Sequence, residues 1–247
     1  MWSSPPSALI LVQQEAHIWK VNLNVRPKHK IYFWGTLSLE EQNRAERFRF
    51  EKDKEHFIIS RGVLRRLLGR YLQIDAREIK FQYGTHGKPM ISKNHALQFN
   101  ISHSEGFALL GFVSHLSIGV DIQVMNPGID IFQIAKRVFS PNEFKALDTM
   151  HSSEQVLAFF NGWSRKEAFI KAKGEGLSFA LDTFDVSIKP NDPPKVLSTS
   201  WNIREASNWS LYKIDVNDGF VGAMALEGHV DTVRYFDFLT CCMDNKG

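Results

Sequence analysis

Cysteine is nearly absent from this chain, which holds only two cysteines in 247 residues. They are adjacent, at Cys241 and Cys242, so they supply neither a disulfide framework nor the four ligands of a structural zinc site. This usage favours a reducing compartment, and we expect a cytoplasmic protein. Cys241 and Cys242 themselves are expected to carry no function.

Long apolar runs are also missing. A membrane-spanning helix needs roughly 20 consecutive apolar residues, and no segment of the sequence approaches that length. The longest apolar run near the N-terminus, Ala8–Val12, follows no positively charged region and precedes no small-residue cleavage site. It is therefore not interpreted as a signal peptide, and no membrane partner is expected.

Charge of one sign is not in large excess. The chain has 30 Lys and Arg residues against 27 Asp and Glu residues, a formal net charge of +3. Seven arginines gather within a short stretch, at positions 44, 47, 49, 61, 65, 66 and 70. Arginine suits bidentate phosphate recognition, but no stacking aromatics accompany the cluster in the pattern typical of nucleic-acid binding. Nucleic-acid binding is therefore the weakest of the functions considered.

Hydrophobic spacing predicts a mixed α+β chain, because period-two alternation indicates strands and spacings of three or four indicate helices. The expected strands cover residues 17–25, 79–83, 99–103, 107–113, 117–124, 184–188, 209–215 and 220–226. The expected helices cover residues 40–48, 54–71, 131–138 and 154–173, with another beginning after Ser140. Capping boxes are predicted at Ser38–Glu41 and Ser140–Glu143.

A weak internal repeat divides the chain. Residues 104–112 resemble residues 217–225, and in each half a long helix precedes a strand and then a turn-linked β pair. We infer two pseudo-symmetric α+β halves, residues 1–125 and 126–247, each a small antiparallel sheet packed by a long helix. The active site is expected at the interface between the halves. Two halves in one chain remove the need for a dimer, so a monomer is expected.

The segment 117–124 offers oxygen ligands on one face. Strand alternation places Asp121 and Gln123 together with Gly119, opposite four apolar residues. A carboxylate and an amide two residues apart can hold a hard cation. The alternative is a solvated polar face with nothing bound, and this segment alone does not decide between them.

The long helix 154–173 places a charge within an apolar stripe. Glu167 lies on the same face as Phe160, Trp163 and Ile170, where a carboxylate is costly unless it is paired or binds a metal. Lys171, four residues later, projects from that face and can pair with Glu167. The two interpretations are an intrahelical ion pair at the rim of the core and a metal ligand with a lysine beside it.

Two shorter segments carry weaker signals. Ser102 and His103 end a strand at a turn, but no nucleophile elbow surrounds them, so anion binding is favoured over a serine hydrolase. Gly87-Lys88-Pro89 lies in a loop and lacks the full phosphate-loop pattern. Lys88 could contribute one cation to a phosphate, or it could be a solvated loop lysine.

Taken together and in order, these segments resemble 4′-phosphopantetheinyl transferases of the surfactin-synthetase-activating type. The resemblance rests on the segments 87–89, 100–104, 119–123 and 163–171, with support from 134–140 and 174–177. It covers about residues 44–184 strongly, and the Trp-x-x-Lys-Glu-Ala-x-x-Lys run from Trp163 to Lys171 is its most specific part. The resemblance implies an α+β fold of two similar halves with the site between them. It also implies coenzyme A as donor and a serine of an apo acyl or peptidyl carrier protein as acceptor.

The resemblance also implies residue roles. It makes Asp121, Glu167 and Lys171 catalytic, with Asp121 and Glu167 holding Mg²⁺. Gln123 stands where the family often has Glu. At this third metal-ligand position an amide replaces a carboxylate, and this is where the chain departs from the family pattern. Coenzyme A would be bound by residues of the first half, namely Arg44, Arg61, Lys88, Pro89, Ser102 and His103. Arg47 would take the place of Arg44 if the register differs by one turn.

The partner implied by the resemblance is an acidic carrier protein. A basic docking surface is therefore expected, with Phe139, Phe144 and Met150 as exposed apolar contacts. The competing function is a module that binds coenzyme A or a carrier protein without catalysis. Mg²⁺-dependent product formation, rather than binding, would separate the two.

Overall fold

The computed structural model describes residues 2–91, 96–176 and 179–238. Its strands are β1 (Glu15–Asn22), β2 (Phe81–Tyr83), β3 (Pro89–Ile91), β4 (Leu97–Ser104), β5 (Phe107–Ser114), β6 (Ile118–Val124), β7 (Phe184–Val186), β8 (Val196–Thr199), β9 (Trp209–Ile214), β10 (Phe220–Glu227) and β11 (Thr232–Phe238). Its α-helices are α1 (Pro27–Trp34), α2 (Leu39–Ala45), α3 (Glu51–Leu72), α4 (Ile131–Val138), α5 (Pro141–Asp148) and α6 (Ser152–Lys173). The expected α+β class is confirmed. Cys241 and Cys242 lie outside the described residues.

Two sheets repeat one topology. The strand order β1-β5-β4 in the first sheet matches β6-β10-β9 in the second. In each sheet, the strand that precedes the long helix pairs antiparallel with the second strand of a hairpin. This repetition confirms two pseudo-symmetric halves. The second repeat begins with β6, so the junction between the repeats precedes the expected division at residues 125 and 126.

One strand crosses from the end of the chain into the first sheet. β11 lies beside β1 and runs parallel to it, with Glu15 opposite Thr232. The first sheet is therefore mixed and not purely antiparallel as expected. The Arg234 Nε lies 2.7 Å from Glu15 Oε1, which ties β11 to β1. No strand was predicted there, because the charged residues of β11 interrupt its apolar alternation.

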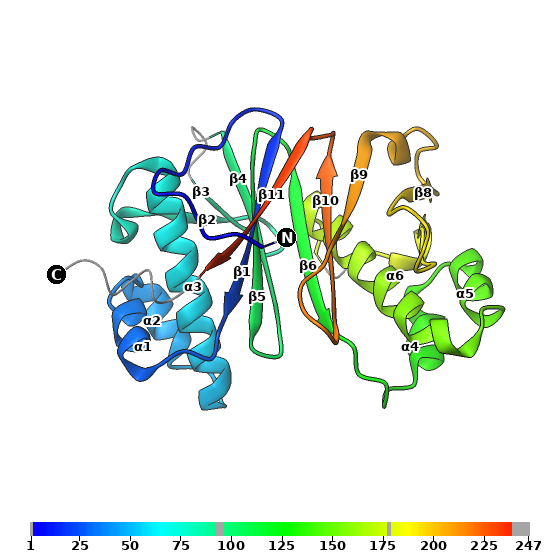
Figure 1. The fold of residues 1–247 in the computed structure, drawn as a ribbon, viewed down its shortest axis with the longest axis horizontal. Helices are drawn as coiled ribbons and strands as arrows, with labels where there is room; N and C mark the ends of the chain where they lie inside the picture. The colour runs from blue at the N-terminus through cyan, green and yellow to red at the C-terminus, as the bar shows by residue number, and fades with distance from the viewer. Residues whose placement is uncertain (1, 92–95, 177–178, 239–247) are drawn as a thin grey trace.

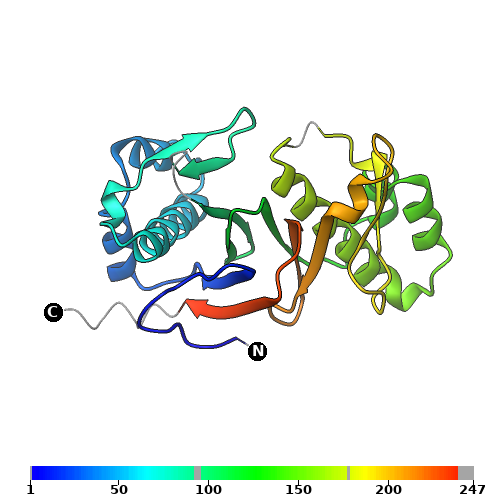
Figure 2. The same ribbon diagram turned by 90° about the horizontal axis from the view of Figure 1, so that it is seen from above.

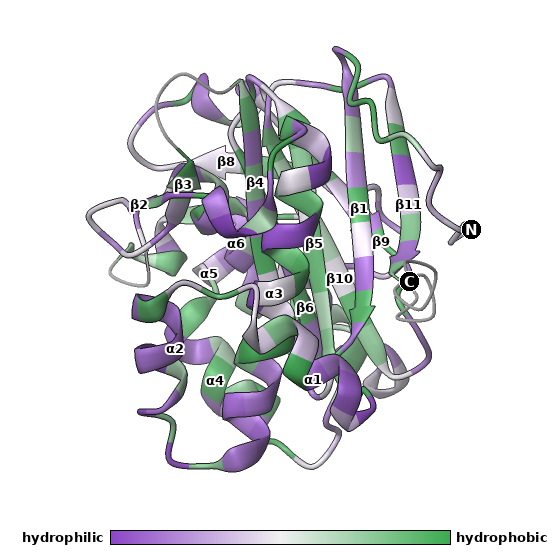
Figure 3. Ribbon diagram, turned by 90° about the vertical axis from the view of Figure 1, so that its left-hand side faces the viewer, coloured by the Kyte–Doolittle hydropathy of each residue, from purple (hydrophilic) through white to green (hydrophobic). Residues whose placement is uncertain are grey.

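The helices cover the outer sides of the two sheets. Figure 1 shows α1, α2 and α3 beside the first sheet and α4, α5 and α6 beside the second, with the strands between them. The view from above separates the two helical groups in the same way (Figure 2). Hydrophobic residues follow β5 and β6 through the middle of the molecule (Figure 3). The apolar faces of α3 and α6 are buried in the two main core clusters with residues of the strands, and such burial favours folding.

Local signals set the ends of several helices. Both capping boxes are present, since the Ser38 and Ser140 side chains accept from the N–H groups of Glu41 and Glu143. α6 ends at Gly174, whose φ of 77° is unstrained for glycine. α1 was not predicted, because its Ile31 is 76% exposed and breaks the amphipathic pattern. None of the helices in the described residues is long and apolar enough to cross a bilayer.

Candidate active site

The two sheets meet where β4 faces the edge of β6. Side chains of β4 bond this edge, and Val120 N–H donates to Asn100 Oδ1 at 2.9 Å. Val124 N–H likewise donates to Ser104 Oγ at 3.0 Å. Together with Ser102, these alternate residues of β4 form a row that we call the polar seam (Asn100, Ser102 and Ser104). The sequence shows these polar residues at every second position, but the motifs did not predict that they bond the edge of β6.

Asp121 is the centre of the site. Its side chain is 1% exposed, so the alternative of a solvated polar face is wrong. Its Oδ1 accepts from Lys171 Nζ at 2.6 Å and from Ser102 Oγ at 2.9 Å. Its Oδ2 accepts from Gln123 Nε2 at 3.0 Å. Side chains from β4, β6 and α6 thus converge on one buried carboxylate, as such a group requires.

Gly119 makes this convergence possible. A Cβ on Gly119 would lie 2.0 Å from the main-chain oxygen of Ala168 and 2.4 Å from the nitrogen of Ala172. β6 therefore packs directly against the backbone of α6, with alanines on the facing side. Only glycine allows this approach, which brings Asp121 within reach of Lys171.

Glu167 lies in a cavity of about 340 Å³ at this junction, which Lys171, Pro89 and Asn100 also line. Burial and the nearby Asp121 carboxylate raise the pKa of Glu167, while Lys171 opposes the shift. Lys171 bonds Asp121 and Ser102 instead. Among the described residues no ion pair joins Glu167 to Lys171, so the simple intrahelical pair is not formed.

Lys88 reaches the same junction from the β2–β3 hairpin. Its Nζ donates to the main-chain oxygens of Lys171 at 2.6 Å, Ile118 at 3.1 Å and Ala172 at 3.2 Å. Burial lowers the pKa of Lys88 to about 8. The alternative of a solvated loop lysine is therefore wrong. Pro89 lines the same cavity as Glu167.

The predicted coenzyme-binding arginines form a second group on α2 and α3. Arg61 is 8% exposed and its Nε lies 3.4 Å from Glu41 Oε1. Burial lowers the pKa of Arg61. Arg44 is exposed and shares the ring of Phe57 with Arg61. Arg44 and Arg47 both line a cavity of about 300 Å³.

His103 follows Ser102 on β4 and has an exposed side chain. Desolvation by its neighbours and the nearby Lys171 ammonium lower the pKa of His103. Adjacent residues of a strand point to opposite sides, so the His103 side chain leaves β4 on the side opposite Ser102. The structure brings Ser102, Asp121, Gln123 and Lys171 into direct contact, and Glu167 lies in the adjoining cavity.

Two of the three predicted docking residues are accessible. Phe144 and Met150 are half-buried at the surface of α4–α6. Phe139 is only 4% exposed and packs against Phe159 in the core. The expectation that Phe139 is an exposed contact is therefore wrong.

Lys166, next to Glu167 in the same motif, points the opposite way. Its Nζ lies 2.8 Å from Glu143 Oε2 and donates to the carbonyls of Leu181 at 2.7 Å and Phe184 at 2.5 Å. Both charged side chains are almost wholly buried. Sequence reasoning assigned no role to Lys166, and the structure shows that it ties α6 to α5 and β7.

Replacement of Lys166 with Met is expected to lower the free energy of unfolding by about 3–5 kcal/mol, because Glu143 would be left as an unpaired buried charge. Urea denaturation measures this loss. Lys145→Met, at an exposed site on α5, is the matched control. A loss no larger than that of the control would show that the pair does not stabilise the fold.

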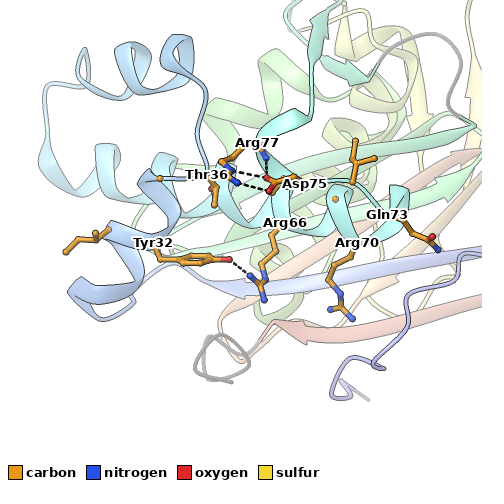
Figure 4. Close-up of a pocket in the computed structure, with 12 residues that line it drawn as sticks. Tyr32, Thr36, Arg66, Arg70, Gln73, Asp75 and Arg77 are labelled. Carbon is orange, nitrogen blue, oxygen red and sulfur yellow. Dashed lines mark hydrogen bonds and ion pairs between the residues drawn. The ribbon is translucent and has the colours of Figure 1, made fainter. Parts of the chain in front are cut away.

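A cavity larger than the one that Glu167 lines is found elsewhere in the described part of the chain. It has a volume of about 780 Å³ and lies between α1 and the end of α3 (Figure 4). Its three guanidinium groups already have partners: Arg66 donates to the Tyr32 hydroxyl, Arg70 to the carbonyls of Pro6 and Ser7, and Arg77 to Asp75. It contains none of the motif residues, so size alone does not identify the site.

A metal site built from three or more His, Cys, Asp or Glu side chains is absent from the described residues. Asp121 and Glu167 nevertheless fit a cation that keeps most of its water, because Mg²⁺ needs only one or two protein carboxylates. Their mutual repulsion contributes to the raised pKa of Glu167. The Lys171 ammonium supplies the counter-charge at Asp121 in this structure.

The structure has two α+β repeats, and the carboxylate of Asp121 pairs with the ammonium of Lys171 at their junction. This is the arrangement that the sequence resemblance implies for a transferase. Sequence comparisons agree. The model of the 4′-phosphopantetheinyl transferase superfamily matches residues 117–225, and that of the N-terminal part of a 4′-phosphopantetheinyl transferase matches residues 26–114.

Individual relatives span much of the chain. The 4′-phosphopantetheinyl transferase HetI of Nostoc sp. is 33% identical over 92% of this chain and 94% of its own length. Sfp of Bacillus subtilis is 36% identical over 63% of this chain and 68% of its own length. A human L-aminoadipate-semialdehyde dehydrogenase-phosphopantetheinyl transferase is 32% identical over 63% of this chain and 54% of its own length. The chain belongs to the 4′-phosphopantetheinyl transferase superfamily.

Proposed function

We propose that this protein transfers the 4′-phosphopantetheine arm of coenzyme A to a serine of an apo acyl or peptidyl carrier protein. The products are the holo carrier protein and adenosine 3′,5′-bisphosphate. The observation that carries the proposal is the convergence of Ser102, Asp121 and Lys171 beside Glu167 at the junction of the two repeats. A binding module has no need of all these groups, so the non-catalytic alternative leaves them unexplained. With both repeats in one chain, we propose that the enzyme acts as a monomer.

The reaction needs a base and a neutralised diphosphate. The serine hydroxyl of the carrier attacks the pantetheine-bearing phosphorus, and the bond from this phosphorus to the bridging oxygen breaks. Glu167, whose raised pKa suits a proton acceptor, takes the serine proton directly or through water. Lys171 donates to the diphosphate oxygens as negative charge moves to the leaving group.

Mg²⁺ is the proposed cofactor. When bound by Asp121, Glu167 and water, it would neutralise the charge of the diphosphate, which otherwise repels the nucleophile. In this structure Gln123 turns its amide nitrogen, and not its oxygen, toward Asp121 Oδ2. We propose that Gln123 contributes weakly and that water completes the shell.

Coenzyme A is proposed to lie along the first repeat. His103 and Arg44 would take the 3′-phosphate, and Arg61, Ser102 and Pro89 would hold the nucleotide and the remaining phosphates. Arg44 is exposed and available to a phosphate. Phe144 and Met150 are proposed as apolar contacts for the carrier protein.

Intact-mass spectrometry tests the proposed function. The purified protein is incubated with an apo carrier protein, coenzyme A and Mg²⁺. A gain of roughly 340 Da on the carrier, the mass of the phosphopantetheine arm, is expected. The gain should disappear with Asp121→Ala and with Glu167→Ala. No gain with fatty-acid, polyketide and peptide carriers, despite measurable binding of coenzyme A, would favour the binding module.

The titration of Glu167 should respond to its two charged neighbours. In the metal-free protein its carboxyl should titrate above the ordinary value of 4.5. Asp121→Asn should lower the pKa of Glu167 and Lys171→Met should raise it. Carbon-13 NMR of the Glu167 carboxyl follows both shifts, and Asp218→Asn, at an exposed turn, is the control. Since the base must be ionised, the transfer rate should fall as the pH drops through the pKa that Glu167 has in the Mg²⁺-loaded protein. A pKa that neither neighbour moves would contradict the proposed coupling.

Gln123→Glu should tighten Mg²⁺ binding, because a third carboxylate adds charge to the ligand set. We expect the Mg²⁺ concentration for half-maximal transfer to fall by about tenfold. Titration of the transfer rate with Mg²⁺ measures this change. An unchanged Mg²⁺ concentration for half-maximal transfer would show that the side chain at position 123 does not face the cation.

A further inference from the structure

We infer that Lys88 is a positioning residue, which holds the last turn of α6 so that Lys171 stays beside Asp121. This inference rests on the proposed function. It differs from the expected role of Lys88 as a phosphate contact. The hairpin that carries Lys88 leans toward the C-terminal end of α6 (Figure 2).

The hydrogen bonds of Lys88 support this role. An ammonium group has three N–H donors, and the three acceptors are main-chain carbonyls of Ile118, Lys171 and Ala172. No donor is left for a phosphate unless Lys88 releases one carbonyl. Such a release would leave one of these main-chain carbonyls without its hydrogen bond at the half-buried junction of the two repeats.

Two of the three acceptors lie at the end of a helix, where a cationic donor is favourable. The final carbonyls of a helix lack intrahelical partners and carry the negative end of the helix dipole. Gly174 N–H already returns to Ile170 O, and Lys88 donates to the two carbonyls that follow. Ile118 O lies at the start of β6, an edge strand of the second sheet. One ammonium therefore ties the end of α6 to β6 and to the first repeat.

Lys88 affects the active site by fixing the backbone of Lys171. Its carbonyl oxygen is held by Lys88 while its side-chain Nζ bonds Asp121 and Ser102. A shift in the last turn of α6 would move Lys171 away from both oxygens. Misplacement of about 1 Å can cost about 100-fold in rate.

Lys88→Met tests this inference because it keeps an unbranched side chain and removes the donors. In the free protein we expect backbone hydrogen exchange at residues 170–174 to rise by about tenfold or more, with exchange in the middle of α3 unchanged. In transfer assays kcat should fall by about 10- to 100-fold. The KM for coenzyme A should stay within about threefold of its original value.

Lys80→Met is the matched control, since Lys80 is exposed just before β2 and its loss changes the net charge equally. A rise in KM for coenzyme A with kcat unchanged would overturn the inference and make Lys88 a ligand contact. Unchanged exchange in the last turn of α6 would also overturn it. If the original protein transfers nothing, the proposed function fails, and the exchange experiment still decides whether Lys88 holds α6.

Discussion

Asp121→Asn is expected to lower the transfer rate by about 1,000-fold while the protein stays folded. The substitution keeps the shape of the side chain but removes the negative charge of the carboxylate, which accepts hydrogen bonds from Lys171, Ser102 and Gln123. One hydrogen-bond donor at a transition state is worth about 100- to 1,000-fold, and Asp121 is proposed to place both Lys171 and a cation. The initial rate of holo-carrier formation, followed by intact mass, gives the measurement.

Asp218→Asn provides the control for this experiment, because Asp218 is an exposed carboxylate in the turn before β10. Circular dichroism and thermal unfolding should show that the Asp121→Asn variant is folded before its rate is compared. If the folded variant keeps more than about a tenth of the original rate, Asp121 is not the centre of the reaction.

Gly119→Ala is expected to have the second large effect, and it should act on both stability and rate. The added Cβ would lie 2.0 Å from a backbone oxygen of α6, so neither a rotamer change nor a small side-chain shift can relieve the contact. Overpacking of this kind costs typically 1–3 kcal/mol and at times more. We expect a loss of about 3 kcal/mol or more in the free energy of unfolding, measured by urea denaturation.

The rate of any folded Gly119→Ala protein should fall by about 100-fold, since α6 carries both Glu167 and Lys171 and must move away from Asp121. Gly35→Ala is the control, because Gly35 has an ordinary φ of −67° and its nearest contact for a Cβ is 3.5 Å. A Gly119→Ala protein as stable and as active as Gly35→Ala would show that β6 and α6 tolerate a wider separation.

Local patterns were sufficient for most of the fold. The capping boxes at Ser38 and Ser140 and the apolar stripe of α3 depend on neighbours within one or two helical turns, so the sequence displays them directly. The repeated order of helix and hairpin likewise predicted two similar halves. α1 and the short β3 and β8 were not predicted, because each is held by tertiary contacts more than by its own pattern.

β11 shows the limit of such patterns most clearly. Its pairing with β1 joins residues more than 200 positions apart, and its interrupted alternation gives no sign of a partner. The ion pair between Glu15 and Arg234 depends on that pairing. No local rule relates two such distant segments.

Residue types and spacings were enough to show which groups are available for chemistry. The motif that contains Glu167 and Lys171, and the strand that contains Asp121, were both identified in this way. Which of these groups pair depends on the tertiary structure, because hydrogen bonding requires short distances between separate elements. The fold pairs Lys171 with Asp121 and not with Glu167, Lys88 with the end of α6, and Lys166 with Glu143. The close approach of β6 and α6 at Gly119 is the physical reason that the first of these pairings is possible.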